Sequence, residues 1–429
     1  MPTLDTQRLD FRVGADTPLG LALRRYWTPV CMSSDVAEPD CDPIRVWVLG
    51  QSYVVFRDTA GRVGVIDEAC PHRKASLVFG RNEEGGIRCL WHQWKIATDG
   101  ALLETPNNPD GGFRERVKAN AYDVVESGGL IWGYFGPAEL KPPFPEFQWA
   151  GLPPENVLII PVDLDCNFVR PLEGLVDTSH VALLHADAVK RLSREFGAGD
   201  GAALNADSMP HLELELTDFG FHYAAIRNLP SDTDAAQVRM TAYAAPYACF
   251  ISPGDHAHIS VPQDDTHTRL YNVMWSRDQR LDAGEARDRL IAMYGLTDEI
   301  LDRQGIRATM PPPGPLGRRN HFVQDRDAMR SGETFTGNLG LTAEDAVMTV
   351  TIGSISDYRG EHLTPADLGV VRLRRAVNDI ATSVAAGREP VGLRPRTDTR
   401  RIGAPSGVLA VGADWRLLVP DHARLDKTA

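Results

Sequence analysis

Apolar and polar residues alternate in short runs over much of the chain, and turn-forming residues separate these runs. The runs over 44–66 and 128–136 combine β-branched and aromatic residues with glycine-containing turns, which is typical of short strands. Similar alternation returns in several runs between residues 211 and 276. A proline-rich segment, 141–147, separates the two groups. The pattern therefore predicts two β-rich units joined by a linker.

Helical patterns surround these strands. Thr17-Pro18 and Thr364-Pro365 each place a capping threonine before a proline at the first helical position. The first pair predicts a short helix and the second a helix running to about residue 386. A third helix is predicted over 283–294, with Gly295 as its stop signal. Mixed helices and strands around one sheet predict an α+β fold for the second unit.

Composition narrows the classes of protein. The chain has 429 residues and a formal net charge of −13, which disfavours nucleic-acid binding because that requires basic patches. No apolar run reaches the roughly 20 residues of a membrane span. The N-terminus lacks the apolar core of a signal peptide, so we expect a cytoplasmic protein without membrane contact. Outside the motifs below, the cysteines are expected to be reduced thiols: Cys31, Cys41, Cys166 and Cys249.

The stretch 172–185 gathers side chains that bind or orient metals: Glu173, Asp177, His180 and His185. On a helix the first three fall on one face. His185 lies about 140° further round than His180, so the two imidazoles converge where the helix has a π-bulge or ends between them. Two imidazoles and a remote carboxylate suit non-haem Fe(II) and leave positions open for O2. The alternative is a pair of core-facing histidines.

A second metal-binding group lies upstream, with the spacing C-x-H-x16-C-x2-H. Its members are Cys70, His72, Cys89 and His92. Zinc sites usually draw each thiolate pair from one C-x2–4-C arm, whereas here each arm supplies one cysteine and one histidine. That pattern fits a Rieske [2Fe–2S] cluster, in which two cysteines bind one iron and two histidines the other. A zinc ribbon or unrelated residues are the alternatives.

With both motifs in this order, the sequence resembles the catalytic α subunit of Rieske non-haem iron oxygenases. The matching segments are C-P-H-R-K-A-S-L, C-L-W-H-Q-W-K-I and L-E-G-L-V-D-T-S-H-V-A-L-L-H. Within that family the chain is most similar to the phthalate-dioxygenase-type group, and the resemblance covers about 25 to about 376. The family usually has Y-H-G-W around the second cluster histidine, where this chain has W-H-Q-W. Trp91 and Gln93 are therefore expected to alter packing beside the cluster.

The resemblance implies three parts: an N-terminal helix segment over 1–27, an all-β Rieske domain over 28–145 and a catalytic domain over 146–429. The catalytic domain is expected to have the helix-grip (START-like) fold, an antiparallel sheet around a long C-terminal helix. A polar loop is expected over 187–209, and the tail after residue 387 carries little information.

By the same resemblance Asp345 is the third iron ligand, and Glu344 is its nearest rival. The alternative for Asp345 is an ordinary acid at a helix N-terminus. The resemblance also gives Asp177 hydrogen bonds to His180 and to His92 of a neighbouring subunit, which would order both rings. Glu173 either orients a ligand or is structural.

The implied activity is that of a terminal oxygenase, which uses O2 and electrons from a separate reductase or ferredoxin, and so indirectly NAD(P)H. The expected reaction is ring dihydroxylation of an aromatic, carboxylated substrate, and O-demethylation within the same family is the alternative. Arg227 and Arg239 are the candidates for pairing with a carboxylate, while His222 and His258 are expected to be structural. A homotrimer or homohexamer would bring the cluster of one subunit beside the iron of the next.

Two other classes of protein remain open at this point. A Rieske electron carrier without catalysis needs only the upstream motif, and His180, His185 and Asp345 argue against it. A zinc-binding structural protein would use the same cysteines and histidines without any iron.

Overall fold

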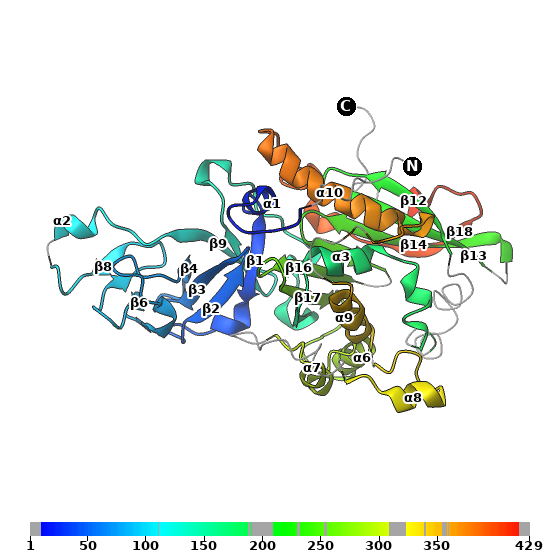
Figure 1. Ribbon diagram of the computed structural model, residues 1–429, viewed down its shortest axis with the longest axis horizontal. Coiled ribbons are helices and arrows are strands. Elements are labelled where there is room, and N and C mark those ends of the chain that lie inside the picture. Colours follow the sequence, from blue (N-terminus) through cyan, green and yellow to red (C-terminus); the bar gives the residue numbers. More distant parts are fainter. Residues whose placement is uncertain are drawn as a thin grey trace.

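The molecule is elongated, with a small β-rich unit at one end of its longest axis and a broader α+β unit at the other (Figure 1). This structure is a computed structural model, and it describes residues 10–109, 111–187, 190, 209–229, 232–252, 255–308, 323–338, 340–353, 358 and 360–419. The polar loop expected over 187–209 lies almost entirely outside the described residues. Within them, no helix combines the length and apolar composition needed to cross a membrane.

The small unit consists of two antiparallel sheets, with strand orders β1-β10-β9-β4-β3-β2 and β5-β6-β7-β8. The strands of the first sheet are β1 (Trp27–Met32), β2 (Ile44–Val48), β3 (Gln51–Arg57), β4 (Val63–Asp67), β9 (Ala121–Ser127) and β10 (Leu130–Tyr134). Those of the second are β5 (Arg81–Glu83), β6 (Gly86–Arg88), β7 (Lys95–Ile96) and β8 (Leu102–Glu104). The predicted run 128–136 contains β10, which lies between β1 and β9.

Aromatic packing holds the proline-rich segment between the two units. Phe144 meets Trp27 and Trp132 edge-on, each with 5.5 Å between ring centroids. Phe147 stacks on Trp149 at 5.1 Å. These rings belong to one hydrophobic cluster that continues into the large unit. The two units therefore share a continuous core, so this linker is not free to swing.

The helix boundaries predicted from capping residues are confirmed. The Thr17 side chain accepts a hydrogen bond from Gly20 N–H at the start of α1 (Pro18–Leu23). Gly295 adopts the left-handed conformation at the end of α6 (Glu285–Tyr294). Thr364 caps a single 3-10 turn that leads into α10 (Leu368–Ala385). The other helices named below or in Figure 1 are α2 (Gly111–Arg114), α3 (Val169–Val176), α7 (Asp298–Gln304), α8 (Arg326–Ser331) and α9 (Leu341–Thr351).

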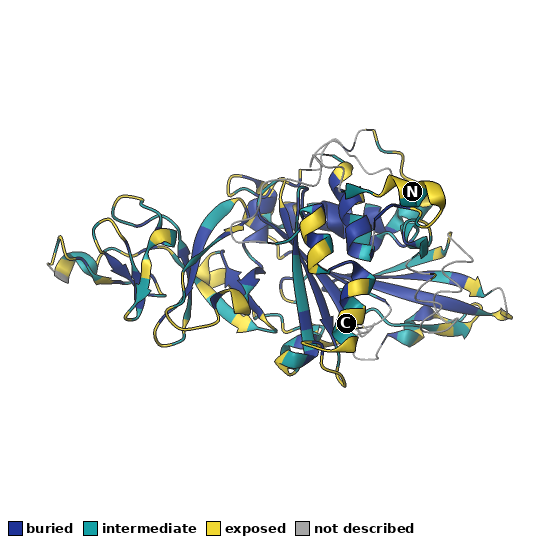
Figure 2. Cartoon of the chain, turned by 90° about the horizontal axis from the view of Figure 1, so that it is seen from below, coloured by how far each residue is buried: buried dark blue, intermediate teal, exposed yellow. Residues whose placement is uncertain are grey.

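The large unit contains an eight-stranded antiparallel sheet with the order β11-β17-β16-β15-β14-β13-β12, and β18 pairs with β14. Its strands are β11 (Val157–Leu164), β12 (His211–Leu216), β13 (Gly220–Leu229), β14 (Asp232–Ala244), β15 (Ala248–Ile251), β16 (His256–Pro262), β17 (Thr268–Trp275) and β18 (Ser406–Ala410). Strands β16 and β17 are buried along their whole length, and the long strands of this sheet are mostly dark blue in Figure 2.

Helix α10 lies across one face of this sheet and packs on α3 (Figure 1). Its buried apolar residues recur every three or four positions, as on the core-facing stripe of a helix: Val370, Leu373, Val377 and Ile380. The predicted α+β fold, with an antiparallel sheet around a long C-terminal helix, is confirmed.

The C-terminal segment covers the other face of the sheet. Trp415 is buried against Val238 and Met240 of β14, and β18 adds a strand beside the same stretch. The sequence pattern after residue 387 predicted no role for this segment. The structure shows that it shields apolar side chains that would otherwise face water.

A buried ionic network joins α3 to α10. Glu173 accepts hydrogen bonds from Arg170 Nη1 at 2.9 Å and from Arg374 Nε at 2.6 Å. Both guanidinium groups lie over the ring of Tyr358, 4.3 Å from its centroid, and both also pair with Glu361. These contacts give Glu173 a structural role in holding α3 against α10.

Helix α9 begins against the end of α6. Gly340, its N-cap, has a φ of 94°, and a Cβ there would lie 2.2 Å from the Cα of Gly295, so glycine is required. Two residues further along, Thr342 Oγ1 donates to Asn272 Oδ1 on β17 at 3.2 Å. These two contacts fix the first turn of α9 over the sheet and so determine where its side chains point.

Candidate metal centres and substrate site

Two loops of the small unit carry the upstream motif, one after β4 and one after β6. The two loops share one hydrogen-bond pattern. The N–H groups of Cys70 and Cys89 donate to the carbonyls of Ala75 and Trp94, five residues later in the chain. The N–H groups of Lys74 and Gln93 donate to the carbonyls of Cys70 and Cys89, four residues earlier. Lys74 and Gln93 have φ of 63° and 60°. This left-handed conformation favours glycine, and Gln93 occupies the position where the resemblance expects one.

The four donor side chains of these loops face one another. His72 Nδ1 lies 3.1 Å from His92 Nδ1. The thiols of Cys70 and Cys89 are buried next to each other, and burial together with the neighbouring thiol raises the pKa of Cys70 to about 11. The His72 ring also stacks on Trp94 with 4.4 Å between centroids. Two adjacent thiols and two adjacent imidazoles fit the donor set of a Rieske cluster.

Large apolar side chains are exposed around these loops: Phe79 at 67%, Leu90 at 60% and Trp91 at 54%. The Trp91 ring stacks on His92 with 5.1 Å between centroids, and the guanidinium of Arg73 lies 4.5 Å above it. An exposed apolar patch of this kind is typical of a contact surface for another protein.

The stretch 172–185 is not a single helix. Helix α3 ends one residue before Asp177, whose backbone is extended. Asp177 Oδ1 accepts hydrogen bonds from the N–H and the hydroxyl of Ser179 at 2.8 and 2.6 Å. This local pairing competes with the helical pattern. The predicted helix face shared by the two acids and His180 is therefore wrong, and a single 3-10 turn, η7 (His180–Ala182), follows instead.

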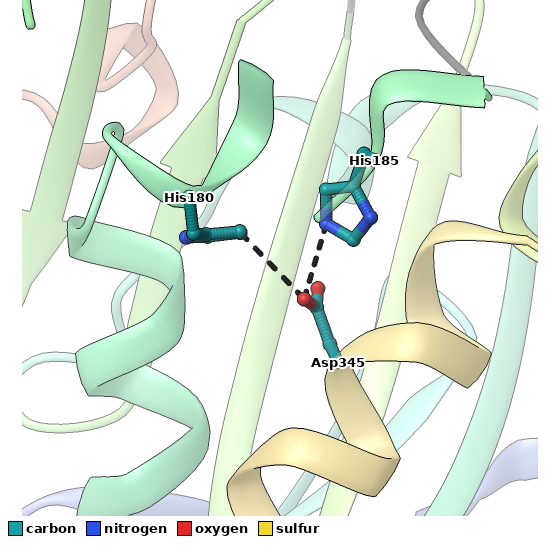
Figure 3. A group of neighbouring side chains, drawn as sticks. All are labelled: His180, His185 and Asp345. Carbon is teal, nitrogen blue, oxygen red and sulfur yellow. Dashed lines mark ion pairs between the residues drawn. The ribbon is translucent and has the colours of Figure 1, made fainter. Parts of the chain in front are cut away.

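His180, His185 and Asp345 converge in the large unit (Figure 3). Asp345 Oδ1 lies 3.1 Å from His185 Nε2 and 3.6 Å from His180 Nε2. One donor atom of each residue lies within 4.8 Å of the other two. The histidines come from the segment after α3, and Asp345 comes from α9. Two imidazoles and one carboxylate suit Fe(II), with coordination positions left for O2.

A further carboxylate lies behind each histidine. His185 Nδ1 is 2.7 Å from Glu344 Oε2, and His180 Nδ1 is 3.4 Å from Asp177 Oδ2. Glu344, the rival of Asp345, thus faces the opposite ring nitrogen of His185. This geometry favours Asp345 as the metal ligand.

The carboxylates control the charge of this centre. Burial alone would lower the pKa of His185, but Asp345 and Glu344 outweigh burial and raise that pKa to about 10. Burial would raise the pKa of Asp345, but the attraction of His185 and His180 lowers it. The centre therefore favours positive charge, which is the electrostatic condition for holding a divalent cation.

Two buried arginines contact Thr178, which precedes His180 by two residues. Arg239 on β14 donates from Nη1 to Thr178 Oγ1 at 3.1 Å and from Nε to the Ser252 carbonyl at 2.7 Å. Arg227 on β13 donates from Nη2 to the Thr178 carbonyl at 3.4 Å. Only 7% of Arg239 and 1% of Arg227 are exposed. Both arginines that were predicted to pair with a substrate carboxylate thus lie inside the large unit. Each contacts Thr178, two residues before His180.

Strand β16 adds two imidazoles that the sequence analysis assigned no role in substrate binding. His256 and His258 are buried with 4.2 Å between ring centroids. Burial lowers the pKa of both, that of His258 to about 4, so both rings are neutral at pH 7. Among the described residues, His256 Nε2 and His258 Nδ1 have no hydrogen-bond partner. Alternation along the strand would have found the pair, because the two residues share one face.

Two protein families match the chain. The Rieske [2Fe-2S] domain family matches residues 26–122, and the family described as "LigXa C-terminal domain like" matches residues 133–428.

Curated relatives with similar sequences include three oxygenase subunits. The phthalate 4,5-dioxygenase oxygenase subunit of Pseudomonas putida is 35% identical, covering 97% of this chain and 94% of the relative. The 3-chlorobenzoate-3,4-dioxygenase oxygenase subunit of Comamonas testosteroni is 33% identical, covering 85% of each chain. The 5,5'-dehydrodivanillate O-demethylase oxygenase subunit of Sphingobium sp. is 30% identical, covering 88% of this chain and 80% of the relative.

Among solved structures, dicamba monooxygenase bound to dicamba aligns with a TM-score of 0.55 at 17% identity. The alignment covers 85% of this chain and 99% of that one. This likeness concerns the fold.

Proposed function

Because this chain belongs to the Rieske non-haem iron oxygenases of the phthalate-dioxygenase type, we propose that it dihydroxylates the ring of an aromatic carboxylic acid. It is the terminal oxygenase of a multicomponent system and receives electrons from a separate reductase or ferredoxin. The observation that carries the substrate proposal is the pair of buried guanidinium groups, Arg227 and Arg239, at Thr178. A carboxylate held there would place an attached ring near His180.

The proposed assignments follow the donor sets. The cluster would be held by Cys70, His72, Cys89 and His92, and the mononuclear iron by His180, His185 and Asp345. When bound, the cluster supplies electrons and the iron activates O2. The proposed domains are an N-terminal segment over 1–27, a Rieske domain over 28–145 and a catalytic domain over 146–429. Because the relatives are oxygenase subunits, a zinc-binding protein and a non-catalytic electron carrier are set aside.

A ring of three subunits would complete the electron path. The cluster loops and the iron-site helices α3 and α9 lie in opposite halves of the elongated chain (Figure 1). Asp177 and His180 keep 23% and 21% of their side chains exposed, which leaves room for a neighbour's His92 to approach Asp177. Head-to-tail contacts of this kind close into a trimer, with a hexamer as a pair of trimers.

O-demethylation is the second candidate reaction. It is favoured by the similarity to the 5,5'-dehydrodivanillate O-demethylase oxygenase subunit. The same ligand set serves both reactions, so the bound position of the substrate decides between them.

A single turnover tests the proposed reaction. The chemically reduced protein, mixed with O2 and a panel of aromatic acids with and without methoxy groups, is expected to add two oxygen and two hydrogen atoms to one ring. Product masses measure this change. Loss of a methyl group as formaldehyde would establish O-demethylation instead. An absence of product from every acid, with cluster and iron bound, would contradict the carboxylate proposal.

Replacing Arg239 with glutamine (R239Q) is expected to lower kcat/KM for the acid substrate by about 30-fold or more. Removing one partner of a buried charge pair costs about 2–5 kcal/mol, and each 1.36 kcal/mol corresponds to about tenfold in rate. Steady-state kinetics on the acid and on its neutral amide measure the effect. R239K is the matched control, since it keeps the charge but loses the planar fork. An equal loss on acid and amide would show that Arg239 acts only on structure.

A further inference from the structure

The first turns of α9 supply two adjacent carboxylates, and the ring of His185 lies between them. Nε2 of His185 is 3.1 Å from Asp345 Oδ1, and Nδ1 is 2.7 Å from Glu344 Oε2. The side chains of His185 and Glu344 are each only 4% exposed, so water does not compete for their contact. The His185 ring is therefore held from both sides by one helix.

We propose that Glu344 is a positioning residue that holds His185 as a metal ligand. With a metal bound, it would accept the Nδ1 proton, which leaves the Nε2 lone pair on the side of Asp345 and makes the imidazole a stronger donor. This inference rests on the proposed iron centre. It gives a role to a residue that sequence reasoning treated only as a competitor for the ligand position.

The second oxygen of Glu344 is also engaged. Thr336 Oγ1 donates to Glu344 Oε1 at 2.7 Å and accepts the N–H of Asn338 at 3.2 Å. The carbonyl of Thr336 accepts from Gln324 Nε2 at 2.7 Å. A chain of hydrogen bonds thus runs from Gln324 through Thr336 and Glu344 to His185. Glu344 would have to break contacts to both oxygens before it could bind a metal, which argues for positioning rather than ligation.

The two histidines are supported differently. His180 lies 3.4 Å from Asp177 Oδ2, and both side chains are more than a fifth exposed. His185 has a shorter contact to a fully enclosed carboxylate. Glu344 therefore holds the buried histidine of the centre, His185, while His180 and Asp177 remain accessible from outside.

Iron release from the full-length, reconstituted protein tests this role. In Glu344→Leu (E344L), loss of Fe(II) to a chelator is expected to be about 10–100-fold faster than in the unmodified protein, the usual effect of removing such a support. The iron-release rate of Glu344→Gln (E344Q) should lie between those of E344L and the unmodified protein, because the amide oxygen of glutamine can still accept the Nδ1 proton of His185. Thr336→Val (T336V) should shift release in the same direction by less. Chelator absorbance follows the iron, and the visible spectrum follows the cluster.

Glu361→Gln (E361Q) is the matched control, because Glu361 pairs with Arg170 and Arg374 at the α3–α10 junction. It should lower the melting temperature without speeding iron release. Wild-type release rates in both E344L and E344Q would overturn the inference, as would faster release in E361Q that matches E344L at equal loss of melting temperature. An unmodified protein that binds iron only in its cluster would instead overturn the proposed iron centre itself.

Discussion

Replacing Asp345 with alanine (D345A) is expected to abolish product formation and to reduce iron from about three atoms per chain to about two, the number in a [2Fe–2S] cluster. Asp345 Oδ1 is the carboxylate oxygen that faces the Nε2 atoms of both His185 and His180. Without it, two imidazoles remain, too few to keep the three-ligand set that suits Fe(II). Iron analysis, the cluster spectrum and product masses measure the three parts of this result.

Asp327→Ala is the matched control for D345A. Asp327 lies on α8 with 90% of its side chain exposed, and within the described part of the chain its only ion-pair partner is Arg330. It should leave iron content and turnover unchanged. If D345A kept its third iron and its activity, Glu344 or another acid would have to be the ligand.

Replacing Asp177 with asparagine (D177N) is expected to stop turnover while the cluster and the iron both remain bound. Asp177 Oδ2 lies 3.4 Å from His180 Nδ1, and the side chain is still 23% exposed. A carboxylate can accept hydrogen bonds from two imidazoles, whereas an amide has one accepting oxygen and a donor group. In the proposed trimer, the hydrogen-bonded path from a neighbour's cluster to this subunit's iron would therefore be interrupted at residue 177.

Stopped-flow absorbance tests D177N directly. Chemical reduction of the cluster should proceed normally, and its reoxidation by O2 in the presence of substrate should be lost. Ser179→Ala is the matched control, because the Ser179 hydroxyl donates to Asp177 Oδ1 while Oδ2 faces His180, and a partial slowing is expected. Normal reoxidation in D177N would contradict the proposed path. Light scattering on the same sample would show whether the variant and the unmodified protein form the same assembly.

The helix boundaries and the cluster motif could be predicted from the sequence because each depends on residues that are near neighbours along the chain. The helix boundaries at Thr17, Gly295 and Thr364 depend on residues within one turn of the boundary. The paired C-x-H and C-x2-H arms likewise need only short loops that close on themselves, as the repeated hydrogen bonds at Cys70 and Cys89 show. Patterns of this range are visible in the sequence because the interacting groups are close neighbours along the chain.

The end of α3 shows where local pattern fails. The spacing of Glu173 and Asp177 fits a helix, yet Asp177 bonds to Ser179 and ends it. Glu173 meanwhile turns to Arg374 on α10, about 200 residues away. Spacing cannot rank a local turn against a helix, because the energy that decides between them comes from packing with distant segments.

The sequence by itself determined the α+β class, the two metal-binding motifs and the family resemblance. By resemblance it also named Asp345 as the iron ligand and Glu344 as its rival, but only the tertiary structure shows which ring nitrogen of His185 each carboxylate faces. Consecutive helical residues point about 100° apart, so the contacts of Gly340 with Gly295 and of Thr342 with β17 set which carboxylate faces Nε2 of His185. The approach of Arg227 and Arg239 to Thr178 was decided in the same way, since it depends on which strands the sheet brings together.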